Sequence, residues 1–202
     1  MRLLLARHGE TDYNRQWRYQ GRTDLGLNQA GRRQAGRLRW RLYREPIYVV
    51  YTSNFKRAVD TAGIIARGRG LRVVPCENLA EIDFGKFEGL TYAEIVKSYP
   101  DWKPSDCNFT AYGGESLEQL AQRIRAFENG LSSDNPADAD ILIIAHSGSL
   151  RVLLCALLGI DIENWLRFRL APASLTVVED FGQEPVLTLL NDVSHLKTGY
   201  RE

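Results

Sequence analysis

The chain has 202 residues and a mass of 22.9 kDa, which is enough for one domain with its own core, and its 44% hydrophobic and 25% charged residues are typical of globular proteins. This composition excludes disordered, collagen-like and coiled-coil proteins, and no apolar run approaches the roughly 18 residues needed to span a bilayer. The formal net charge of +1 hides an asymmetry: residues 1–72 hold 16 Lys and Arg against 5 Asp and Glu, whereas residues 73–202 hold 10 against 20, a pattern that nucleic-acid binding or a concentration of arginines for another purpose would both produce.

The first half of the chain alternates short apolar runs with stretches of helical periodicity. The run at 47–51 is β-branched and aromatic, as in strands, and Thr52, Ser53 and Asn54 offer an N-cap for the helix that follows. The first run, at 3–6, is too short for a secretory signal, so we expect a cytoplasmic protein. In chain order the patterns predict a strand at Leu3–Ala6, a helix at about 28–43, a strand at Ile47–Tyr51, a helix carrying Ala58 to Ala66 and a strand at Leu71–Pro75.

The second half begins with a stretch of different texture, residues 84–114, here called the cap segment. It mixes aromatics, glycines and prolines around one short helix near Tyr92–Ser98, which indicates an insertion over the core. Beyond it the patterns predict a helix from Ser116 to about Leu131, a buried strand at Ile141–Ala145, a helix from about Ser149 to Leu158 that stops at Gly159, and an edge hairpin of Ser174–Glu179 and Val186–Leu190 joined by Gly182 and Pro185.

This alternation predicts the fold class and the number of domains. Strands that alternate with helices form mostly parallel sheets with helices packed on the faces. We therefore expect a three-layer α/β sandwich with a mostly parallel central sheet, helices on both faces and a small cap insertion, in a single domain of residues 1–202.

Polar residues follow four of the predicted strands. Arg7 and His8 come directly after the first strand, Arg57 lies early in the helix after the second, Glu81 follows the third and His146 ends the fourth. Because ligands of open α/β sheets bind at the carboxyl ends of the strands, these side chains are expected to meet in one site.

Six segments in chain order resemble the histidine phosphatase superfamily, also called the phosphoglycerate mutase-like fold. They read Arg-His-Gly-Glu-Thr-Asp-Tyr-Asn from Arg7, Tyr-Gln-Gly from Tyr19, Ser-Asn-Phe-Lys-Arg-Ala-Val-Asp-Thr-Ala from Ser53, Glu-Ile-Asp-Phe-Gly-Lys-Phe-Glu-Gly from Glu81, Gly-Gly-Glu-Ser-Leu from Gly113 and Ala-His-Ser-Gly from Ala145. The resemblance spans nearly the whole chain and implies one phosphoglycerate mutase-like domain with a cap insertion at about 84–114.

The resemblance also implies roles for the strand-end residues. His8 is expected to attack phosphorus and to carry a phosphohistidine, and His146 to bind a phosphoryl oxygen. Glu81 is expected to donate the proton to the leaving oxygen and then to activate water. Its rivals are Asp83, Glu10 and Glu88, and spacing alone does not separate Glu81 from Asp83.

Chemistry of the residue types supports a phosphoryl site. Phosphoryl transfer spreads negative charge over three oxygens, and the guanidinium groups of Arg7 and Arg57 can each bind two of them. The resemblance also implies substrate contacts at Asn14, Gln20 and Gly21, although the amides of Asn14 and Gln20 could instead form local turn hydrogen bonds. The backbone amide of Ser147, at the start of the following helix, is expected to donate to phosphate. For His195 we expect packing or capping rather than substrate contact.

No metal or other cofactor is expected. The sequence has no clustered metal-ligand spacing, and two arginines can supply the charge that a metal would. The three cysteines, odd in number and without paired spacing, predict reduced thiols, with Cys155 in the core: Cys76, Cys107 and Cys155.

Hydrolysis is favoured over phosphoglycerate mutase activity. The cap segment holds Lys86, Lys97 and Lys103 but no arginine, whereas a mutase must hold a second anionic group. The leading candidate substrate is α-ribazole 5′-phosphate, and the alternatives are phosphoserine and sugar phosphates. Phe84 counts mildly against phosphoserine, because phosphoserine-specific relatives tend to have a histidine there.

Other function classes are less well supported. A phosphoprotein phosphatase would be expected to have a more open site than a capped chain provides, and a non-catalytic binding module would not need the intact set of strand-end residues. The aromatic side chains of the cap segment could hold an apolar leaving group or could pack the segment onto the core.

The charge asymmetry then has a simpler explanation than a polyanion partner. Arg7 and Arg57 belong to the phosphate site, and the arginines of the helix at 28–43 are expected to face solvent or to pair with carboxylates of the second half. The expected partner is a small phosphomonoester substrate, with neither nucleic acid nor membrane, and the sequence leaves the oligomeric state open.

Overall fold

The structure is a computed structural model that describes residues 1–103, 107–179 and 184–197. Its strands are β1 (Arg2–Arg7), β2 (Ile47–Ser53), β3 (Arg72–Cys76), β4 (Asp140–Ala145), β5 (Leu175–Glu179) and β6 (Val186–Asp192). Its α-helices are α1 (Asp12–Arg15), α2 (Gln29–Arg41), α3 (Lys56–Ala66), α4 (Tyr92–Ser98), α5 (Leu117–Asp134) and α6 (Ser147–Leu157). Short 3-10 turns lie at Glu77–Leu79 (η1), Gly85–Phe87 (η2), Thr110–Tyr112 (η3), Ile162–Arg167 (η4) and Ser194–Leu196 (η5).

The six strands form one sheet in the order β3-β2-β4-β1-β5-β6. The first four in sequence, β1 to β4, are mutually parallel, whereas β5 runs antiparallel to both β1 and β6. The predicted mostly parallel sheet and the predicted hairpin at its edge are therefore confirmed. Of the residues expected to join that hairpin, Gly182 lies outside the described residues.

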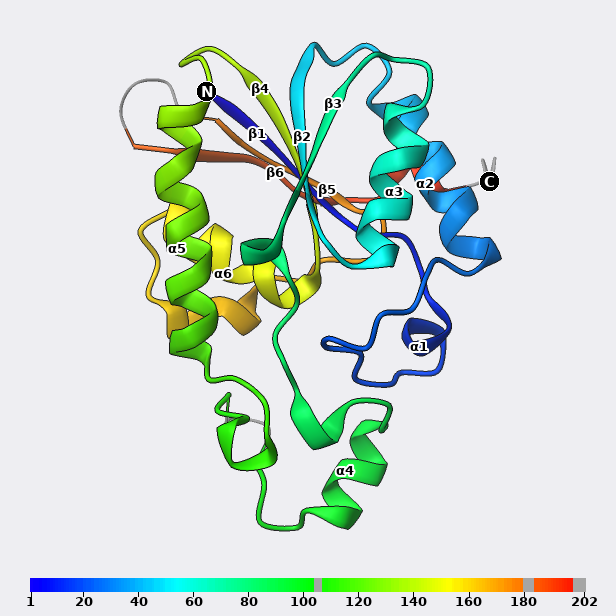
Figure 1. Cartoon of the computed structure of the whole chain (residues 1–202), viewed down its shortest axis with the longest axis vertical. Helices are drawn as coiled ribbons and strands as arrows, with labels where there is room; N and C mark the ends of the chain where they lie inside the picture. The colour runs from blue at the N-terminus through cyan, green and yellow to red at the C-terminus, as the bar shows by residue number, and fades with distance from the viewer. Residues whose placement is uncertain (104–106, 180–183, 198–202) are drawn as a thin grey trace.

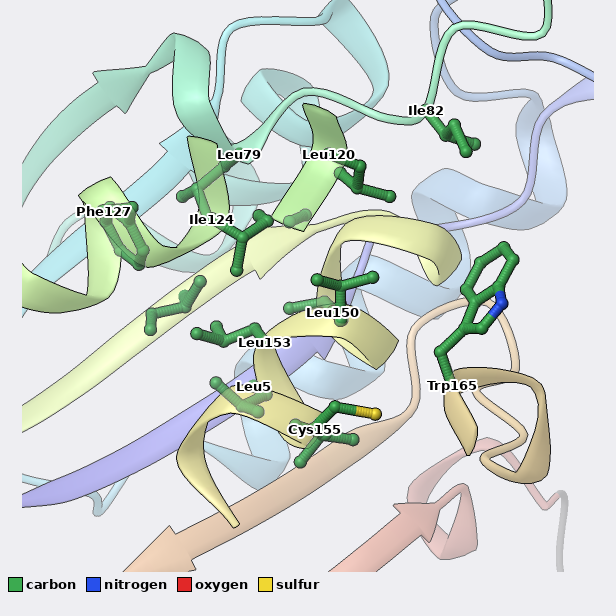
Figure 2. Close-up of a cluster of buried hydrophobic side chains, with 14 of the residues drawn as sticks. Leu5, Leu79, Ile82, Leu120, Ile124, Phe127, Leu150, Leu153, Cys155 and Trp165 are labelled. Carbon is green, nitrogen blue, oxygen red and sulfur yellow. The ribbon is translucent and has the colours of Figure 1, made fainter. Parts of the chain in front are cut away.

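Alternate residues of the strands bury side chains on opposite faces of the sheet, as the period of two requires. Leu3 and Leu5 of β1 join a core cluster with α5 and α6, whereas Leu4 and Ala6 join a second cluster with α2 and α3. Figure 1 shows these two pairs of helices on either side of the sheet. Figure 2 shows the first cluster, in which Cys155 takes the predicted core position. This is the expected three-layer α/β sandwich.

Several element boundaries match local sequence signals. The helix α4 occupies the predicted residues 92–98 and begins at a capping box on Thr91, and α5 begins at a capping box on Ser116. Two boundary predictions are wrong. The helix α6 begins at Ser147, two residues before the predicted start.

The predicted N-cap of α3 at residues 52–54 is also wrong. The N-cap is Phe55, whose side chain makes no capping bond, while Thr52 and Ser53 remain in β2. The backbone N–H of Lys56 instead donates to Asp24 Oδ1 at 2.7 Å. A carboxylate 32 residues earlier in the chain therefore accepts the N-terminal hydrogen bond that a local capping residue was expected to accept.

The cap segment lies beyond the carboxyl ends of the parallel strands, with α4 at the lower end of Figure 1. It is held by the loop after α1: Tyr19 N–H donates to Leu90 O at 2.9 Å, and Gly89 N–H donates to Tyr19 O at 2.8 Å. Arg18 also forms an ion pair with Glu94 at 2.9 Å. This loop and the cap segment therefore form one continuous wall above the sheet.

The described helices include none that is long and apolar enough to cross a membrane.

Candidate active site

A cavity of about 640 Å³ lies at the carboxyl ends of the parallel strands. Of the nine residues predicted for the site, eight line it: Arg7, His8, Asn14, Gln20, Gly21, Arg57, Glu81 and Ser147. The ninth, His146, is fully buried behind the wall, with its ring centroid 5.0 Å from that of His8. The topology thus brings all nine together from positions 7 to 147 of the chain.

A second cavity, of about 720 Å³, lies between the cap segment, the start of α5 and η4. Its lining includes Glu118 and Glu163 but no arginine, lysine or histidine among the described residues. Its charge therefore does not favour a phosphorylated ligand, and the smaller cavity is the candidate site.

The imidazole of His8 is poised as a nucleophile. Its Nδ1–H donates to Gly9 O at 2.7 Å, which leaves the lone pair on Nε2. Burial, together with the positive charges of Arg57 and Arg7, lowers the pKa of His8 well below 6.5, so the ring is neutral at physiological pH. The backbone at Gly9 packs closely against α2: a Cβ at this position would lie 2.5 Å from Gly31 O, so the position has no room for a larger residue.

The guanidinium of Arg57 is fully buried without a carboxylate partner among the described residues. Its Nη1 and Nη2 donate to Thr23 O and Gly21 O at 2.9 and 2.6 Å. Burial lowers its pKa to about 10, so it stays charged at neutral pH. Its Nε donates to the neutral ring of His146, so every hydrogen-bond partner of this buried cation is uncharged, and an anionic ligand would offset the cost of its burial.

The side chain of Arg7 is held by the loop at residues 170–174. Its Nη1 donates to Leu170 O at 2.7 Å, and Ala173 N–H lies 3.1 and 3.0 Å from Arg7 O and His8 O. Burial lowers the pKa of Arg7 to about 10 as well. His195 does not line the cavity and supports this loop from behind, since its Nε2–H donates to Ala173 O at 3.0 Å.

Both ring nitrogens of His146 are occupied by protein groups. Nδ1 accepts from Arg57 Nε at 3.0 Å, so the proton lies on Nε2, which donates to Ser53 Oγ at 2.8 Å. Burial, followed by the charge of Arg57, lowers the pKa of His146 well below 6.5. In this arrangement the ring orients Arg57, and direct contact with a phosphoryl oxygen requires one of these bonds to be exchanged.

The geometry separates Glu81 from its rivals. Glu81 lines the cavity, where its two oxygens accept from the N–H groups of Gly148 and Ser149, both at 3.2 Å, at the N-terminus of α6. The carboxylate of Glu10 lies in the same wall but accepts from Asn28 Nδ2 at 2.8 Å.

The other two carboxylates are engaged outside the cavity. Asp83 accepts from Gly85 N–H at 2.8 Å and pairs with Arg22 at 3.3 Å. Glu88 accepts from the N–H groups of Arg22 and Thr23 at 2.7 and 2.8 Å. Neither lines the cavity.

The amides of Asn14 and Gln20 are oriented by Thr11. Gln20 Oε1 lies 2.9 Å from Thr11 Oγ1 and Asn14 Oδ1 lies 3.1 Å from Thr11 N, so each amide has its oxygen engaged and its NH₂ group available to a ligand. Three buried donors of the cavity wall have no acceptor among the described residues: Arg7 Nε, Gln20 Nε2 and Arg151 Nε. Unpaired donors gathered in one cavity favour an anionic ligand.

Arg151 lines the cavity but was not among the residues predicted for the site. It lies in α6 four residues after Ser147, and this spacing places both on one face of the helix. That spacing, measured from a predicted site residue, is the signal that could have found it. Other lining residues not predicted for the site are Glu10, Arg15, Trp17, Arg18, Tyr19, Phe84 and Pro172.

Most aromatic side chains of the cap segment pack against one another. Phe87 is fully buried, with its ring centroid 5.2 Å from that of Trp102 and 5.8 Å from that of Phe109. Of the aromatic residues of this segment, Phe84 lines the cavity, in edge contact with Tyr19. The packing interpretation therefore holds for the core of the cap segment.

Within the described part of the chain, no group of three or more His, Cys, Asp or Glu residues could hold a metal ion. The three cysteines all lie among the described residues and are not joined by disulfide bonds: Cys76, Cys107 and Cys155.

Comparison with known proteins supports these observations. A model of the histidine phosphatase superfamily, branch 1, matches residues 3–193. The chain is 32% identical over 206 residues to phosphoserine phosphatase 1 of Hydrogenobacter thermophilus, an alignment that covers 100% of this chain and 97% of that protein.

Two solved structures share the fold. The mycobacterial glucosyl-3-phosphoglycerate phosphatase in complex with VO3 is 33% identical, with a TM-score of 0.84, and the match covers 94% of this chain and 98% of that one. The alpha-ribazole phosphatase from Shigella flexneri is 28% identical, with a TM-score of 0.83 and coverage of 95% and 96%.

Proposed function

The chain belongs to the histidine phosphatase superfamily and is a phosphatase, and from this premise we propose that it hydrolyses small phosphomonoesters through a phosphohistidine on His8 without a metal ion. The observation that carries the proposal is the set of buried, unpaired donors around a neutral imidazole. Arg57 and Arg7 are cations without carboxylate partners, and Arg7 Nε and Gln20 Nε2 have no acceptor among the described residues.

In the first half-reaction the two guanidinium groups bind the phosphoryl oxygens and offset their charge. His8 Nε2 attacks phosphorus, and the bond from phosphorus to the ester oxygen breaks. Glu81 gives its proton to that oxygen, which departs as an alcohol. The backbone N–H of Ser147 and the amide of Asn14 complete the set of donors.

In the second half-reaction Glu81, now a carboxylate, takes a proton from water, and the water oxygen attacks phosphorus. The bond from phosphorus to His8 Nε2 breaks, which releases inorganic phosphate and restores the neutral imidazole. His146 keeps the predicted role of a phosphoryl contact in this proposal, and its bond to Arg57 positions that guanidinium in both steps.

For the leaving group, the candidates from the sequence are α-ribazole 5′-phosphate, then phosphoserine and sugar phosphates. The named relatives include an alpha-ribazole phosphatase, a phosphoserine phosphatase and a glucosyl-3-phosphoglycerate phosphatase. Hydrolysis is proposed over mutase activity because these three relatives are named as phosphatases.

The test is a panel of phosphomonoesters assayed with wild type and with His8→Ala, after exhaustive chelation of metals. We expect the wild type to turn over and to form an acid-labile phosphoenzyme, and His8→Ala to lose activity by at least about 1,000-fold. Arg33→Gln is the control, because that exposed side chain of α2 lies outside the cavity. Full activity of His8→Ala would overturn the mechanism, and loss of wild-type turnover on chelation would overturn its metal independence.

A further inference from the structure

Arg151 is a charged side chain in the cavity wall that the proposed chemistry does not use. It projects from α6 into the lining that includes Arg7, His8 and Glu81. Its guanidinium carbon lies 6.0 Å from the ring centre of Trp165, a buried side chain of η4 that Figure 2 labels. The indole supports the guanidinium but supplies no hydrogen-bond acceptor.

The other arginines of the cavity wall all have protein partners. Arg7 donates to Leu170 O, and Arg57 to Thr23 O and Gly21 O. Arg15 pairs with Asp12 at 3.0 Å, and Arg18 pairs with Glu94 at 2.9 Å.

Arg151 has neither a hydrogen bond nor an ion pair within the described residues, and its Nε is buried without a partner. Glu81 lies in the same wall, but its oxygens are engaged by Gly148 and Ser149. Arg151 is therefore a cation in the cavity whose donors remain available.

We propose that Arg151 binds a carboxylate on the leaving group, so that the enzyme prefers phosphomonoesters that carry a carboxylate close to the phosphate. This inference rests on the proposed function, because it assigns Arg7 and Arg57 to the phosphoryl group. A planar guanidinium matches a carboxylate by two parallel N–H···O bonds, which neutral alcohol or sugar leaving groups cannot offer.

Charge balance favours a carboxylate over a second phosphate. The two cations Arg7 and Arg57 offset the phosphoryl dianion, and Arg151 adds a single positive charge. A second dianion would leave uncompensated negative charge in the cavity, because Arg15 and Arg18 are already paired with Asp12 and Glu94 and no lysine of the cap segment lines the cavity.

The test uses two pairs of substrates that differ in the carboxylate: 3-phosphoglycerate against glycerol 3-phosphate, and phosphoserine against phosphoethanolamine. We expect the wild type to prefer the acid in each pair by roughly 10- to 100-fold in kcat/KM, mainly through KM. Arg151→Gln is expected to bring both ratios close to one, chiefly by losing activity on the acids. Arg151→Lys keeps the positive charge but loses the planar pair of N–H donors, so its kcat/KM ratios are expected to lie between those of the wild type and Arg151→Gln. Arg33→Gln, at an exposed site on α2, is the control and is expected to retain both ratios.

The outcomes separate this inference from the proposed function. Hydrolysis of p-nitrophenyl phosphate by the wild type without preference for either acid would overturn the role of Arg151 alone. The role of Arg151 would also be overturned if Arg151→Gln and Arg151→Lys keep the wild-type kcat/KM ratios, or if they lose activity equally on the acid and the neutral substrate of a pair. A preference of the wild type for α-ribazole 5′-phosphate over both acids would overturn it as well. Absence of turnover on every phosphomonoester would instead reject the proposed function.

Discussion

Arginines in two regions of the molecule have opposite surroundings. Arg7 and Arg57 line the cavity, where burial lowers the pKa of each to about 10 and protein carbonyl groups are their oxygen partners. On α2, Arg32 and Arg41 are exposed and pair with carboxylates, Arg32 with Asp60 at 3.5 Å and Arg41 with Asp192 at 3.7 Å. Burial without a counter-ion, rather than the number of arginines, therefore distinguishes the candidate anion site.

This difference also explains the uneven charge of the chain. Part of the basic excess of residues 1–72 lines the cavity, and much of the rest lies on the solvent face of α2. Carboxylates of the second half pair with it, since Arg2 lies 2.9 Å from Asp140 and 3.3 Å from Glu179. Of the helix arginines for which the sequence predicted such pairs, Arg41 lies 3.7 Å from Asp192 of the second half, whereas Arg32 pairs with Asp60 of the first half.

The largest effect is expected when one arginine is removed from the cavity and, for comparison, one from α2. Arg57→Gln is expected to lower kcat/KM by about 1,000-fold or more, because the transition state loses a preorganised cation. Arg33→Gln on α2 is the matched control, and its activity should stay within a factor of two or so, as expected for a surface change. Steady-state kinetics with p-nitrophenyl phosphate would measure both, and equal effects of the two changes would contradict the distinction.

A second substitution disturbs the cavity without changing its charge. A Cβ at Gly148 would lie 2.4 Å from Glu81 Oε1, so Gly148→Ala is expected to displace the carboxylate and to lower kcat by about 100-fold. Gly63→Ala is the control, because a Cβ there meets no atom within 4 Å; it should keep activity and gain up to about 1 kcal/mol of helix stability. A Gly148→Ala enzyme with unchanged kcat would show that Glu81 does not need its present position.

The buried histidines of the site are expected to make the free energy of unfolding depend on pH. Because the folded pKa values of His8 and His146 lie well below 6.5, the unfolded chain binds protons in a range where the folded chain does not. Their contribution is therefore constant above pH 6.5, and the free energy of unfolding falls below it by up to about 1.4 kcal/mol per pH unit for each histidine. Urea unfolding at pH 7.5, 6.5 and 5.5 would measure this slope. His8→Gln should reduce it by one proton, and a slope that does not change would contradict the burial effect.

The smallest effects are expected at the exposed ion pairs of α2. Arg32→Gln and Arg41→Gln should each change the free energy of unfolding by less than about 1 kcal/mol, because solvent screens the pairs with Asp60, Glu45 and Asp192. Thermal unfolding at low and high salt would test this. A loss of several kcal/mol in the free energy of unfolding would contradict this expectation and would show that the ion pairs of α2 stabilise the fold.

The sequence by itself determined the fold class, the order of the elements and the residues delivered to the ends of β1 to β4. These follow from local properties: the period of two in strands, capping boxes such as the one on Ser116, and polar residues directly after apolar runs. These signals, together with the resemblance to the histidine phosphatase superfamily, predicted nine site residues, of which eight line the cavity.

Tertiary structure alone decided which groups are engaged and which are available. Asp24 replaces the predicted cap of α3, His146 is occupied by Arg57 and Ser53, and Glu81 rather than Asp83 faces the cavity. Among the described residues Arg151 has no hydrogen bond or ion pair, and the oxygens of Glu81 in the same wall are bound by Gly148 and Ser149. Each outcome depends on hydrogen bonds between residues far apart in the chain. Which donor pairs with which acceptor is set only when folding brings these residues together.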